Sequence, residues 1–347
     1  MSEGMTAMST ASGAGSTSTE AMLSVEGLAV EFMTPSGWTP VVDDVSFSVG
    51  RGETVGLVGE SGSGKSVTGL AVMGLVPAPA GRISAGRIVF QGRDLVPLRP
   101  RELRRLRGDH IAMVFQEPMT SLNPSFTVGD QIAEMVRTHR RISRRAAMNH
   151  ARTMLDRMGI PNSTHAVKRY PHEFSGGMRQ RVMLAMAISC EPELLIADEP
   201  TTALDVTIQA QVLDLIREMR DELGMSVLFV SHDLGVVAEL CDRVVVMYAA
   251  QTVEDCDADS IFTRPNHPYT EGLLTSTPRF AGARERLSTI EGRPPLPWAM
   301  PPGCHFHPRC PYAEQACAEE PIIMRATGPN TAVRCRRADE LTLRGAE

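Results

Sequence analysis

The feature that most constrains the fold of this chain is the run Gly59-Glu60-Ser61-Gly62-Ser63-Gly64-Lys65-Ser66. The run follows an apolar, strand-like segment at residues 54–58 and precedes a helical pattern at residues 67–75. A strand, a glycine-rich turn and a Gly-Lys-Ser helix start together form a phosphate-binding loop. A flexible Gly/Ser loop is the alternative, but both flanks match the context that the motif requires. The sequence therefore predicts a site for a nucleoside triphosphate.

The chemistry of this loop follows from its residue types. Glycines let the backbone curl so that successive N–H groups face one anion, and the helix N-terminus adds positive partial charge. We expect Lys65 to reach the β- and γ-phosphates and the Ser66 hydroxyl to bind Mg²⁺. The residues expected to contact the nucleotide here are Gly59, Ser61, Gly62, Ser63, Gly64, Lys65 and Ser66.

Two adjacent carboxylates follow another predicted strand. The apolar segment at residues 194–197 ends in Asp198-Glu199. Neighbouring carboxylates repel each other, so a purely structural role for both explains the pair poorly. Downstream of a triphosphate loop, a metal-binding Asp198 and a water-facing Glu199 explain it better. Because strand neighbours point to opposite sides, the two side chains can serve different atoms.

Further polar candidates lie at the ends of predicted strands, where open α/β sheets bind ligands. Gln116 follows a strand at residues 111–115, and His232 follows one at residues 226–230. His232 is a candidate contact to the γ-phosphate, although a histidine in such a place is by itself more often structural. The run Ser175-Gly176-Gly177 opens a predicted helix and can form a second anion-binding cap.

Two aromatic residues, Phe32 and Trp38, flank a predicted turn at residues 34–37 between two predicted strands. Either ring could stack on a nucleobase, although aromatic side chains in such places more often only pack. The residues alone leave the base contact open.

The composition excludes several classes of protein. The chain has 347 residues, enough for one large domain and a smaller one. Its formal net charge of −6 argues against a general nucleic-acid-binding surface. No apolar run approaches the roughly 20 residues that a membrane helix needs, so we expect any membrane role to depend on a partner.

The N-terminus and the cysteines indicate the compartment. Residues 1–20 lack the basic start and apolar middle of a signal peptide, so we expect a disordered tail over residues 1–21 and a cytoplasmic location. Thiols stay reduced there, so the seven cysteines are not expected to form a disulfide framework. Three are scattered and are expected in the core: Cys190, Cys241 and Cys256. Four are clustered in a proline-rich segment and suit Zn²⁺ or an iron–sulfur cluster: Cys304, Cys310, Cys317 and Cys335.

Taken in order, these motifs resemble the ATP-binding cassette (ABC) ATPases. The phosphate loop, Gln116, Ser175-Gly176-Gly177, Asp198-Glu199 and His232 agree with that family in order and spacing. The resemblance covers about residues 23–262. It implies an α/β, P-loop NTPase-type nucleotide-binding domain with a mostly parallel sheet core, an antiparallel β subdomain and a helical subdomain. The implied boundaries are residues 22–264 for this domain, about 117–180 for its helical subdomain and 265–347 for a small Cys-rich C-terminal extension.

The resemblance implies roles for the residues at the strand ends. Ser66, Gln116 and Asp198 would bind Mg²⁺, and Gln116 is also counted among the catalytic residues. Glu199 would be the general base that acts on the attacking water. His232 would contact the γ-phosphate.

Other implied contacts involve the base and a second subunit. The run Ser175-Gly176-Gly177 would address the γ-phosphate bound to the opposite subunit. Asp205 matches the loop that crosses to that subunit. Phe32 best matches the aromatic residue that stacks on adenine, with Trp38 second.

Several segments look like the di- and oligopeptide importers, and these are residues 116–124, 174–181, 266–270 and 301–311. The signature motif departs from the commonest family form, with Phe174 in place of Leu and Met178 in place of Gln. We expect no loss of function, because the serine and both glycines between them are intact. Met178 nevertheless lacks a polar contact to ATP.

This resemblance implies an ATP-hydrolysing subunit that couples ATP binding and hydrolysis at a cassette-dimer interface to uptake of di- or oligopeptides. The implied cofactors are ATP, Mg²⁺ and a 4Fe–4S cluster on the four clustered cysteines, with zinc as the alternative. The implied partners are a second ABC ATPase subunit (identical or a paralogue), two membrane permease subunits and an extracytoplasmic peptide-binding protein, with no nucleic acid. The implied location is peripheral, on the cytoplasmic face of the cell membrane. Nickel, glutathione and antimicrobial-peptide transporters are similar too and are the alternative. A soluble non-transport ABC ATPase is less expected, because such proteins usually carry two cassettes in one chain or a long coiled coil between the motifs, and this sequence has neither.

Overall fold

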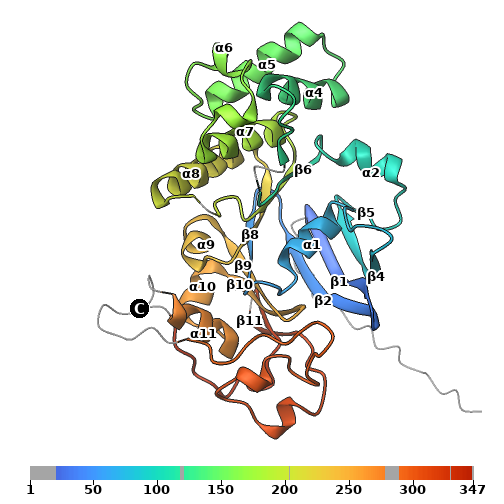
Figure 1. The fold of residues 1–347 in the computed structure, drawn as a ribbon. Helices are drawn as coiled ribbons and strands as arrows, with labels where there is room; N and C mark the ends of the chain where they lie inside the picture. The colour runs from blue at the N-terminus through green and yellow to red at the C-terminus, as the bar shows by residue number, and fades with distance from the viewer. Residues whose placement is uncertain (1–20, 118–120, 203, 278–288, 329, 346–347) are drawn as a thin grey trace, which may run out of the picture.

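The structure is a computed structural model, and it describes residues 21–117, 121–202, 204–277, 289–328 and 330–345. Residues 1–20 of the expected disordered tail lie outside these ranges, as do residues 118–120 of the peptide-importer segment. In Figure 1 a central sheet carries a helical lobe at one end and the C-terminal extension at the other.

An eight-stranded sheet forms the centre of the molecule. In spatial order its strands are β11 (Arg325–Gly328), β12 (Thr331–Val333), β10 (Gln251–Asp257), β9 (Arg243–Tyr248), β3 (Thr54–Val58), β8 (Ser226–Ser231), β7 (Leu194–Asp198) and β6 (Ile111–Val114). The five strands from β9 to β6 run parallel to one another, and β10 pairs with β9 antiparallel. Almost every residue in them is buried, as expected of a sheet covered on both faces, and their sequences are therefore continuous apolar runs.

A second, antiparallel sheet has four strands. Its order is β2 (Gly37–Val49), β1 (Leu23–Thr34), β4 (Gly81–Phe90) and β5 (Arg93–Asp94). β1 and β2 form the hairpin predicted around residues 34–37, with Thr34 paired to Gly37. Their buried side chains share one apolar cluster with α1 (Lys65–Val72), and this places the antiparallel sheet beside the phosphate loop.

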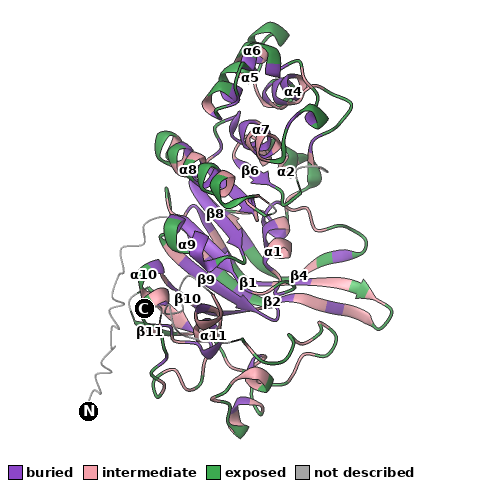
Figure 2. Ribbon diagram, turned by 60° about the vertical axis from the view of Figure 1, so that its left-hand side comes forward, coloured by how far each residue is buried: buried purple, intermediate pink, exposed green. Residues whose placement is uncertain are grey.

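The remaining helices of the cassette cover the central sheet or form the lobe beyond its β6 edge (Figure 1). They are α2 (Pro100–Leu106), α4 (Val128–His139), α5 (Arg144–Arg157), α6 (Ser163–Ala166), η1 (Pro171–Glu173), α7 (Gly176–Ile188), α8 (Val206–Leu223), α9 (Leu234–Leu240) and α10 (Ala258–Thr263). The two faces of β3 belong to different apolar clusters, since Val55 and Leu57 pack on the α1 side and Val58 packs on the side of α7 to α9. Figure 2 shows this buried centre and the exposed outer surfaces of the helices. The arrangement confirms the expected fold class, an α/β cassette with a parallel core and an antiparallel sheet.

The C-terminal extension is joined to the central sheet. It contains α11 (Pro268–Ser276), the short helices η2 (His307–Arg309) and η3 (Gln315–Cys317), and the hairpin β11–β12. β12 pairs with β10, so the hairpin widens the sheet of the cassette. Three aromatic rings, those of Tyr248, Tyr269 and Phe306, pack at centroid distances between 4.6 and 5.3 Å and connect the two parts of the chain.

The segment Asn266 to Thr270, one of the peptide-importer marks, is fixed by a buried carboxylate. Glu254 on β10 is fully buried and accepts hydrogen bonds from the backbone N–H of Asn266 at 2.6 Å and of His267 at 3.1 Å. The Thr270 hydroxyl donates to it at 2.6 Å. Burial raises the pKa of Glu254, and these hydrogen bonds oppose that rise. The motif thus has a local structural role, which is to anchor the start of α11 on β10.

His267 leads to the prediction that acid weakens the folded state. Its ring is buried, and Nδ1 accepts a hydrogen bond from the Tyr269 backbone N–H at 3.1 Å. Burial lowers the pKa of His267 to about 3, against about 6.5 when the chain is unfolded. The unfolded chain therefore binds the proton first, so the contribution of His267 is complete above about pH 6.5 and falls as the pH drops towards 3. Between about pH 7 and pH 5 we expect a loss of about 2 kcal/mol.

The test is urea unfolding of the wild type and of His267→Gln at these two pH values. The variant should lose less stability on acidification than the wild type. His172→Gln is the control, because His172 is exposed and its replacement should leave the pH dependence unchanged. Equal pH dependence in His267→Gln and the wild type would contradict the assignment.

Candidate functional site

The phosphate loop joins the buried strand β3 to α1 and takes the curled shape that its glycines allow. Gly59, Gly62 and Gly64 have φ values of 151°, 81° and 105°, which side chains rarely adopt. A Cβ added to Gly59 would lie 2.1 Å from the backbone oxygen of Met247 on the neighbouring strand β9. Both the conformation and the close approach of β9 therefore require glycine at position 59.

Lys65 lies at the first position of α1, and its side chain is turned back over the loop. It is only 5% exposed, and Nζ donates hydrogen bonds to the backbone oxygens of Gly59 at 2.7 Å and Glu60 at 3.1 Å. Burial lowers the pKa of Lys65, and the negative charges of Glu199, Asp198 and Glu60 oppose that shift. A buried ammonium group beside a loop of backbone N–H groups provides the positive charge that phosphates need.

Asp198 ends β7 next to the start of α1. The Ser66 hydroxyl donates a hydrogen bond to its Oδ1 at 2.9 Å. Burial raises the pKa of Asp198; the Ser66 hydrogen bond and the charge of Lys65 lower it, and the charge of Glu199 raises it further. The pair presents a hydroxyl and a carboxylate oxygen side by side, and oxygen ligands of this kind are those that Mg²⁺ prefers.

Glu199 is the centre of a second set of contacts. The Gln116 amide donates to its Oε2 at 2.8 Å, and the Thr202 hydroxyl donates to the same oxygen at 2.9 Å. The Nδ1 atom of His232 lies 3.1 Å from Oε1. The structure thus brings together three of the predicted residues, Gln116, Glu199 and His232, which come from three different strand ends.

The reason why Asp198 and Glu199 face different partners differs from the predicted one. The prediction relied on the alternation of side chains along a strand. Glu199 instead lies beyond the end of β7 and has a φ of 44°, in the left-handed region that few side chains adopt. The turn, and not the strand, therefore aims its carboxylate.

The electrostatics of Glu199 favour its ionised form. Burial acts to raise its pKa, but hydrogen bonds from His232 and Thr202 and the charges of His232 and Lys65 outweigh burial, and the net pKa lies below the ordinary value. Its side chain is 13% exposed. An ionised carboxylate in a nearly enclosed position can accept a proton from a water molecule.

One buried polar atom fits the presence of an anion. The Ser63 hydroxyl is 4% exposed, and it has no hydrogen-bond partner among the described residues. Buried polar atoms usually have a partner, so an orphaned hydroxyl inside the loop agrees with a phosphate ligand. The residues present therefore fit a nucleotide phosphate together with Mg²⁺.

The Ser175-Gly176-Gly177 run begins α7, where Ser175 is the N-cap and accepts from the Met178 backbone N–H at 3.4 Å. A Cβ on Gly177 would meet the Ile208 side chain at 2.5 Å, whereas Gly176 faces open space. Asp205 is exposed and caps α8, accepting from the Ile208 N–H at 3.0 Å. Among the described residues, no hydrogen bond or ion pair joins this cap or Asp205 to the phosphate loop.

The two aromatic candidates differ in what they contact. Phe32 on β1 is partly buried against the core, and a Cβ on Gly81 would touch its ring at 2.9 Å. The Trp38 ring lies 4.0 Å from the Arg82 guanidinium carbon, a cation–π contact. Both rings thus have packing partners, and Phe32, with Trp38 second, stays a prediction for the base contact.

The signature residue that departs from the common form has a clear packing role. Phe174 is 3% exposed, and the guanidinium carbon of Arg169 lies 4.6 Å from the centre of its ring. An aromatic residue is therefore accommodated here in the core next to the Ser175 cap.

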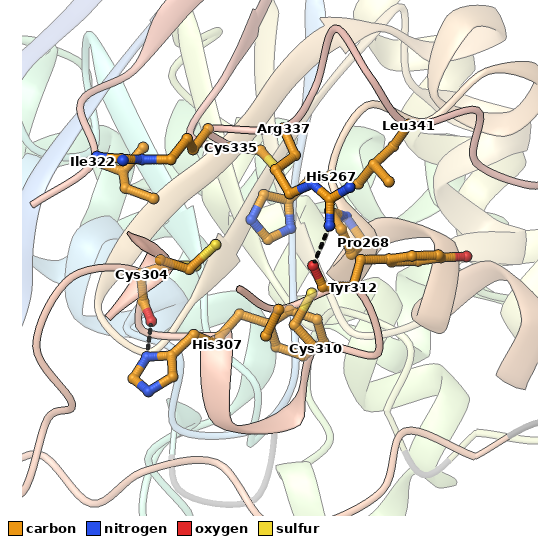
Figure 3. Close-up of a pocket in the computed structure, with 14 residues that line it drawn as sticks. His267, Pro268, Cys304, His307, Cys310, Tyr312, Ile322, Cys335, Arg337 and Leu341 are labelled. Atoms are coloured by element: carbon orange, nitrogen blue, oxygen red, sulfur yellow. Dashed lines mark hydrogen bonds between the residues drawn. The ribbon is translucent and has the colours of Figure 1, made fainter. Parts of the chain in front are cut away.

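The four clustered cysteines line one small cavity together with Phe306 and Tyr312 (Figure 3). Burial, and secondarily the negative charge of the neighbouring thiolates, raises the pKa of Cys304 to about 11. Burial likewise raises the pKa of Cys310 to about 12. Within the described ranges, however, no three His, Cys, Asp or Glu side chains are arranged to hold a metal ion. The structure therefore supports the clustering but not the predicted 4Fe–4S centre itself.

Sequence reasoning missed two contributions to the site. Thr202 bonds the oxygen of Glu199 that also accepts from Gln116, and the backbone oxygen of Met247 lies so close to Gly59 that only glycine fits there. Thr202 could have been noticed from its place three residues after Glu199, whereas nothing in the sequence marks Met247. In the described part of the chain, no helix has the length and apolar character needed to cross a membrane.

Two family models match this chain. The one described as "ABC transporter" matches residues 42–202, a range that includes the phosphate loop and both carboxylates. The one described as "Oligopeptide/dipeptide transporter, C-terminal region" matches residues 253–317, a range that includes the Glu254 anchor and three of the clustered cysteines.

Curated relatives are similar over nearly their whole length. A peptide import ATP-binding protein of Brucella abortus (strain 2308) is 50% identical over 317 residues, which are 91% of this chain and 95% of that protein. The oligopeptide transport ATP-binding protein AppD of Bacillus subtilis (strain 168) is 48% identical over 315 residues, 90% of this chain and 96% of AppD.

Solved structures share the architecture. The ATP-binding cassette MJ0796, in a dimeric post-hydrolysis state bound to ADP and Pi, is 23% identical with a TM-score of 0.62 and covers 68% of this chain and 99% of its own. The cbiO1 protein of Clostridium perfringens, part of the complex cbiONQ, is 27% identical with a TM-score of 0.59 and covers 70% of this chain and 91% of its own. The likeness to MJ0796, at this identity, concerns the fold.

Proposed function

The chain belongs to the ABC transporter family, and on this premise we propose that it is the ATP-hydrolysing subunit of a peptide importer. The similarity to AppD and to the Brucella protein spans the C-terminal extension as well as the cassette, which supports a peptide importer over other ABC systems. The cargo is a di- or oligopeptide in this proposal. Nickel, glutathione or an antimicrobial peptide is the alternative cargo, because other subunits select it.

The single observation that carries the ATPase assignment is the set of contacts that Asp198 and Glu199 make next to the phosphate loop. Ser66 bonds Asp198, and Gln116 and His232 both bond Glu199. The two carboxylates, Gln116 and His232 come from the ends of the neighbouring strands β7, β6 and β8, and Ser66 comes from the start of α1. Only the fold brings them within hydrogen-bonding distance of one another. A metal-binding carboxylate beside a general base is the arrangement that phosphoryl transfer to water requires.

The reaction follows from these positions. The loop and Lys65 hold the β- and γ-phosphates of ATP. Ser66, Asp198 and Gln116 would hold Mg²⁺, which would supply positive charge to neutralise the phosphates. Water attacks the γ-phosphorus while Glu199 takes up one of its protons. The bond from that phosphorus to the β–γ bridging oxygen breaks, and ADP and inorganic phosphate are the products. His232 holds the Glu199 carboxylate in place and offers its ring to the γ-phosphate.

The exposed α7 cap supports a site shared between two subunits. Ser175 and the open space at Gly176 are free to face the ATP of a second cassette, identical or paralogous. ATP then lies between two half-sites, and its hydrolysis releases them. Such a two-state closure is the movement that can drive a transporter. Asp205 is exposed at the start of α8, which agrees with a contact across the same interface.

We also propose that the four clustered cysteines hold a 4Fe–4S cluster, with zinc as the alternative. The four thiolates would be the protein ligands of the cluster, which takes four cysteine ligands. The four thiols share one cavity, and burial together with the negative charge of neighbouring cysteines raises the pKa of Cys304 and of Cys310, so a positively charged group would stabilise their thiolate forms.

The cluster proposal is tested by iron and acid-labile sulfide analysis of chain purified without oxygen. We expect iron and sulfide in equal amounts, and their loss in Cys310→Ser. Cys241→Ser is the control, because Cys241 is buried in the core of the cassette away from the cavity and should leave both unchanged. Zinc without iron would overturn the choice of cluster.

The remaining partners in the proposal are two membrane permease subunits and an extracytoplasmic peptide-binding protein. The chain then sits peripherally on the cytoplasmic face of the cell membrane. Purification of the tagged chain from solubilised membranes, followed by identification of its partners, tests this directly. We expect two permease subunits and a second cassette. A complex in which a single polypeptide encloses the ATP, with no second cassette, would refute the proposed function.

A further inference from the structure

The C-terminal extension contacts the phosphate loop at Glu60. The Glu60 carboxylate accepts two parallel hydrogen bonds from the Arg309 guanidinium, from Nη1 at 2.7 Å and from Nη2 at 3.1 Å. The Glu60 backbone N–H donates to the Tyr269 hydroxyl at 2.8 Å. Arg309, 249 positions away in the sequence, thus holds the side chain of Glu60, and Tyr269, 209 positions away, holds its backbone.

Arg309 is itself held rigidly. Its side chain is 5% exposed, and its Nε donates to the backbone oxygen of Glu291 at 3.0 Å. Nη1 also contacts the Tyr248 hydroxyl at 3.3 Å, and the guanidinium carbon lies 5.7 Å from the centre of that ring. A buried, two-pronged ion pair of this kind fixes geometry as well as charge.

The position of Glu60 bears directly on the nucleotide site. Its backbone oxygen is one of the two that accept from the Lys65 ammonium group. A shift of Glu60 therefore moves an anchor of Lys65 and alters the direction of the neighbouring N–H groups that would face phosphate. Gly59 provides the second backbone oxygen that accepts from Lys65, and it lies against β9. It therefore has little room to move and make up for a shift of Glu60.

We propose that Arg309 is a positioning residue for the nucleotide site. Through Glu60 it holds the phosphate loop in the shape that binds ATP, so the C-terminal extension forms part of that site. This inference rests on the proposed function, because it assumes that the loop binds ATP. It assigns the extension a role in nucleotide binding in addition to any role of its cysteines.

A second ion pair between the extension and the cassette provides a control, because it anchors the extension without contacting the phosphate loop. Arg334, also in the extension and 7% exposed, donates to the Asp44 carboxylate at 2.9 Å on the antiparallel sheet. It also donates to the backbone oxygen of Thr252 at 2.8 Å. Like Arg309, Arg334 ties the extension to the cassette through a buried guanidinium, but its hydrogen bonds go to Thr252, Ile322 and Asp44 and not to the phosphate loop.

The experiment measures the dissociation constant of Mg·ATP by calorimetry, and the thermal midpoint without nucleotide, for the full-length chain. The variants are Arg309→Gln, Glu60→Gln and the double variant, with Arg334→Gln as the control. We expect Arg309→Gln and Glu60→Gln each to weaken Mg·ATP binding about tenfold. The double variant should be no weaker than either single one, because the two residues act through one contact.

Arg334→Gln is expected to lower the thermal midpoint while leaving Mg·ATP affinity unchanged. The inference is overturned if Arg309→Gln binds Mg·ATP as the wild type does, if Arg334→Gln weakens binding equally, or if the two single effects add. A wild-type chain that does not bind Mg·ATP at all would instead overturn the proposed function.

A second variant keeps the test decisive if Arg309→Gln does not fold. Tyr269→Phe retains the ring in its aromatic cluster and removes only the oxygen that accepts from the Glu60 N–H. We expect it to weaken Mg·ATP binding about threefold, in line with the loss of one neutral hydrogen bond. Unchanged affinity in a folded Tyr269→Phe, together with unchanged affinity in Glu60→Gln, contradicts the proposal.

Discussion

Glu199→Gln is expected to slow ATP hydrolysis by about a thousandfold, which lies within the range typical of a lost general base. Glu199 accepts hydrogen bonds from Gln116 and Thr202, and an amide oxygen can continue to accept them. The network around the turn should therefore persist, and the Ser66–Asp198 pair is untouched. What is lost is the carboxylate whose lowered pKa keeps it ready to accept a proton.

Because ATP binding remains intact, the same variant should accumulate in the closed, ATP-bound form. We expect Mg·ATP to convert Glu199→Gln from monomers to cassette pairs that persist, whereas the wild type returns to monomers as ATP is consumed. Phosphate release and light scattering after size exclusion measure the two effects on one sample. If the partner is a paralogue, the pair forms only when that subunit is added.

Glu191→Gln is a matched control for this experiment. Glu191 is the other glutamate of the described chain with a positive φ, 55°, but it is exposed and pairs with Arg140 at 3.7 Å. We expect its replacement to leave hydrolysis within a factor of about two, since exposed ion pairs contribute little. A Glu199→Gln chain that hydrolyses ATP at the wild-type rate would falsify the assignment of the base.

Lys65→Ala is expected to abolish measurable nucleotide binding, with Mg·ATP affinity reduced about a hundredfold or more. Each charge-assisted hydrogen bond to phosphate contributes about 1.5–3 kcal/mol, and Lys65 is placed to make two. In the structure without nucleotide, its ammonium group is bonded to Gly59 and Glu60. Burial lowers the pKa of Lys65, which means that its buried charge does not stabilise the fold. Removing that charge should therefore not lower the stability of the protein without nucleotide.

Lysine usage gives this prediction an unusually clean control. The sequence contains two lysines, Lys65 and Lys168, and Lys168 is exposed in the helical lobe. A thermal-shift series with Mg·ATP should raise the midpoint of the wild type and of Lys168→Ala equally, and leave that of Lys65→Ala unmoved. A midpoint that rises with Mg·ATP in Lys65→Ala as it does in the wild type contradicts the role of this lysine.

The cysteine-rich extension shows the limits of motif reading. The four clustered cysteines were recognisable as a group, and they do line one cavity. A set of thiols alone suits more than one metal group, and among the described residues no three His, Cys, Asp or Glu side chains are arranged to hold a metal ion. The adjoining peptide-importer segment has a structural explanation that the sequence did not suggest, the buried Glu254 that caps it from a separate strand.

Local chemistry determined much of this protein before any fold was considered. The strand, loop and helix at residues 54–72 follow from apolar periodicity and glycine placement within a few positions of one another. The candidate residues Lys65, Asp198 and Glu199 were evident for the same reason. Short-range patterns of this kind depend only on backbone geometry and on side chains a turn apart.

The tertiary structure alone decided how these residues meet. Glu199 is aimed by a left-handed turn and bonded by Gln116, 83 positions away, while the phosphate loop is held by Arg309, 249 positions away. The hairpin of the extension also joins the cassette sheet, which no local pattern indicates. Contacts over such separations depend on strand order and on packing between whole elements, and neither is written in any single stretch of the sequence.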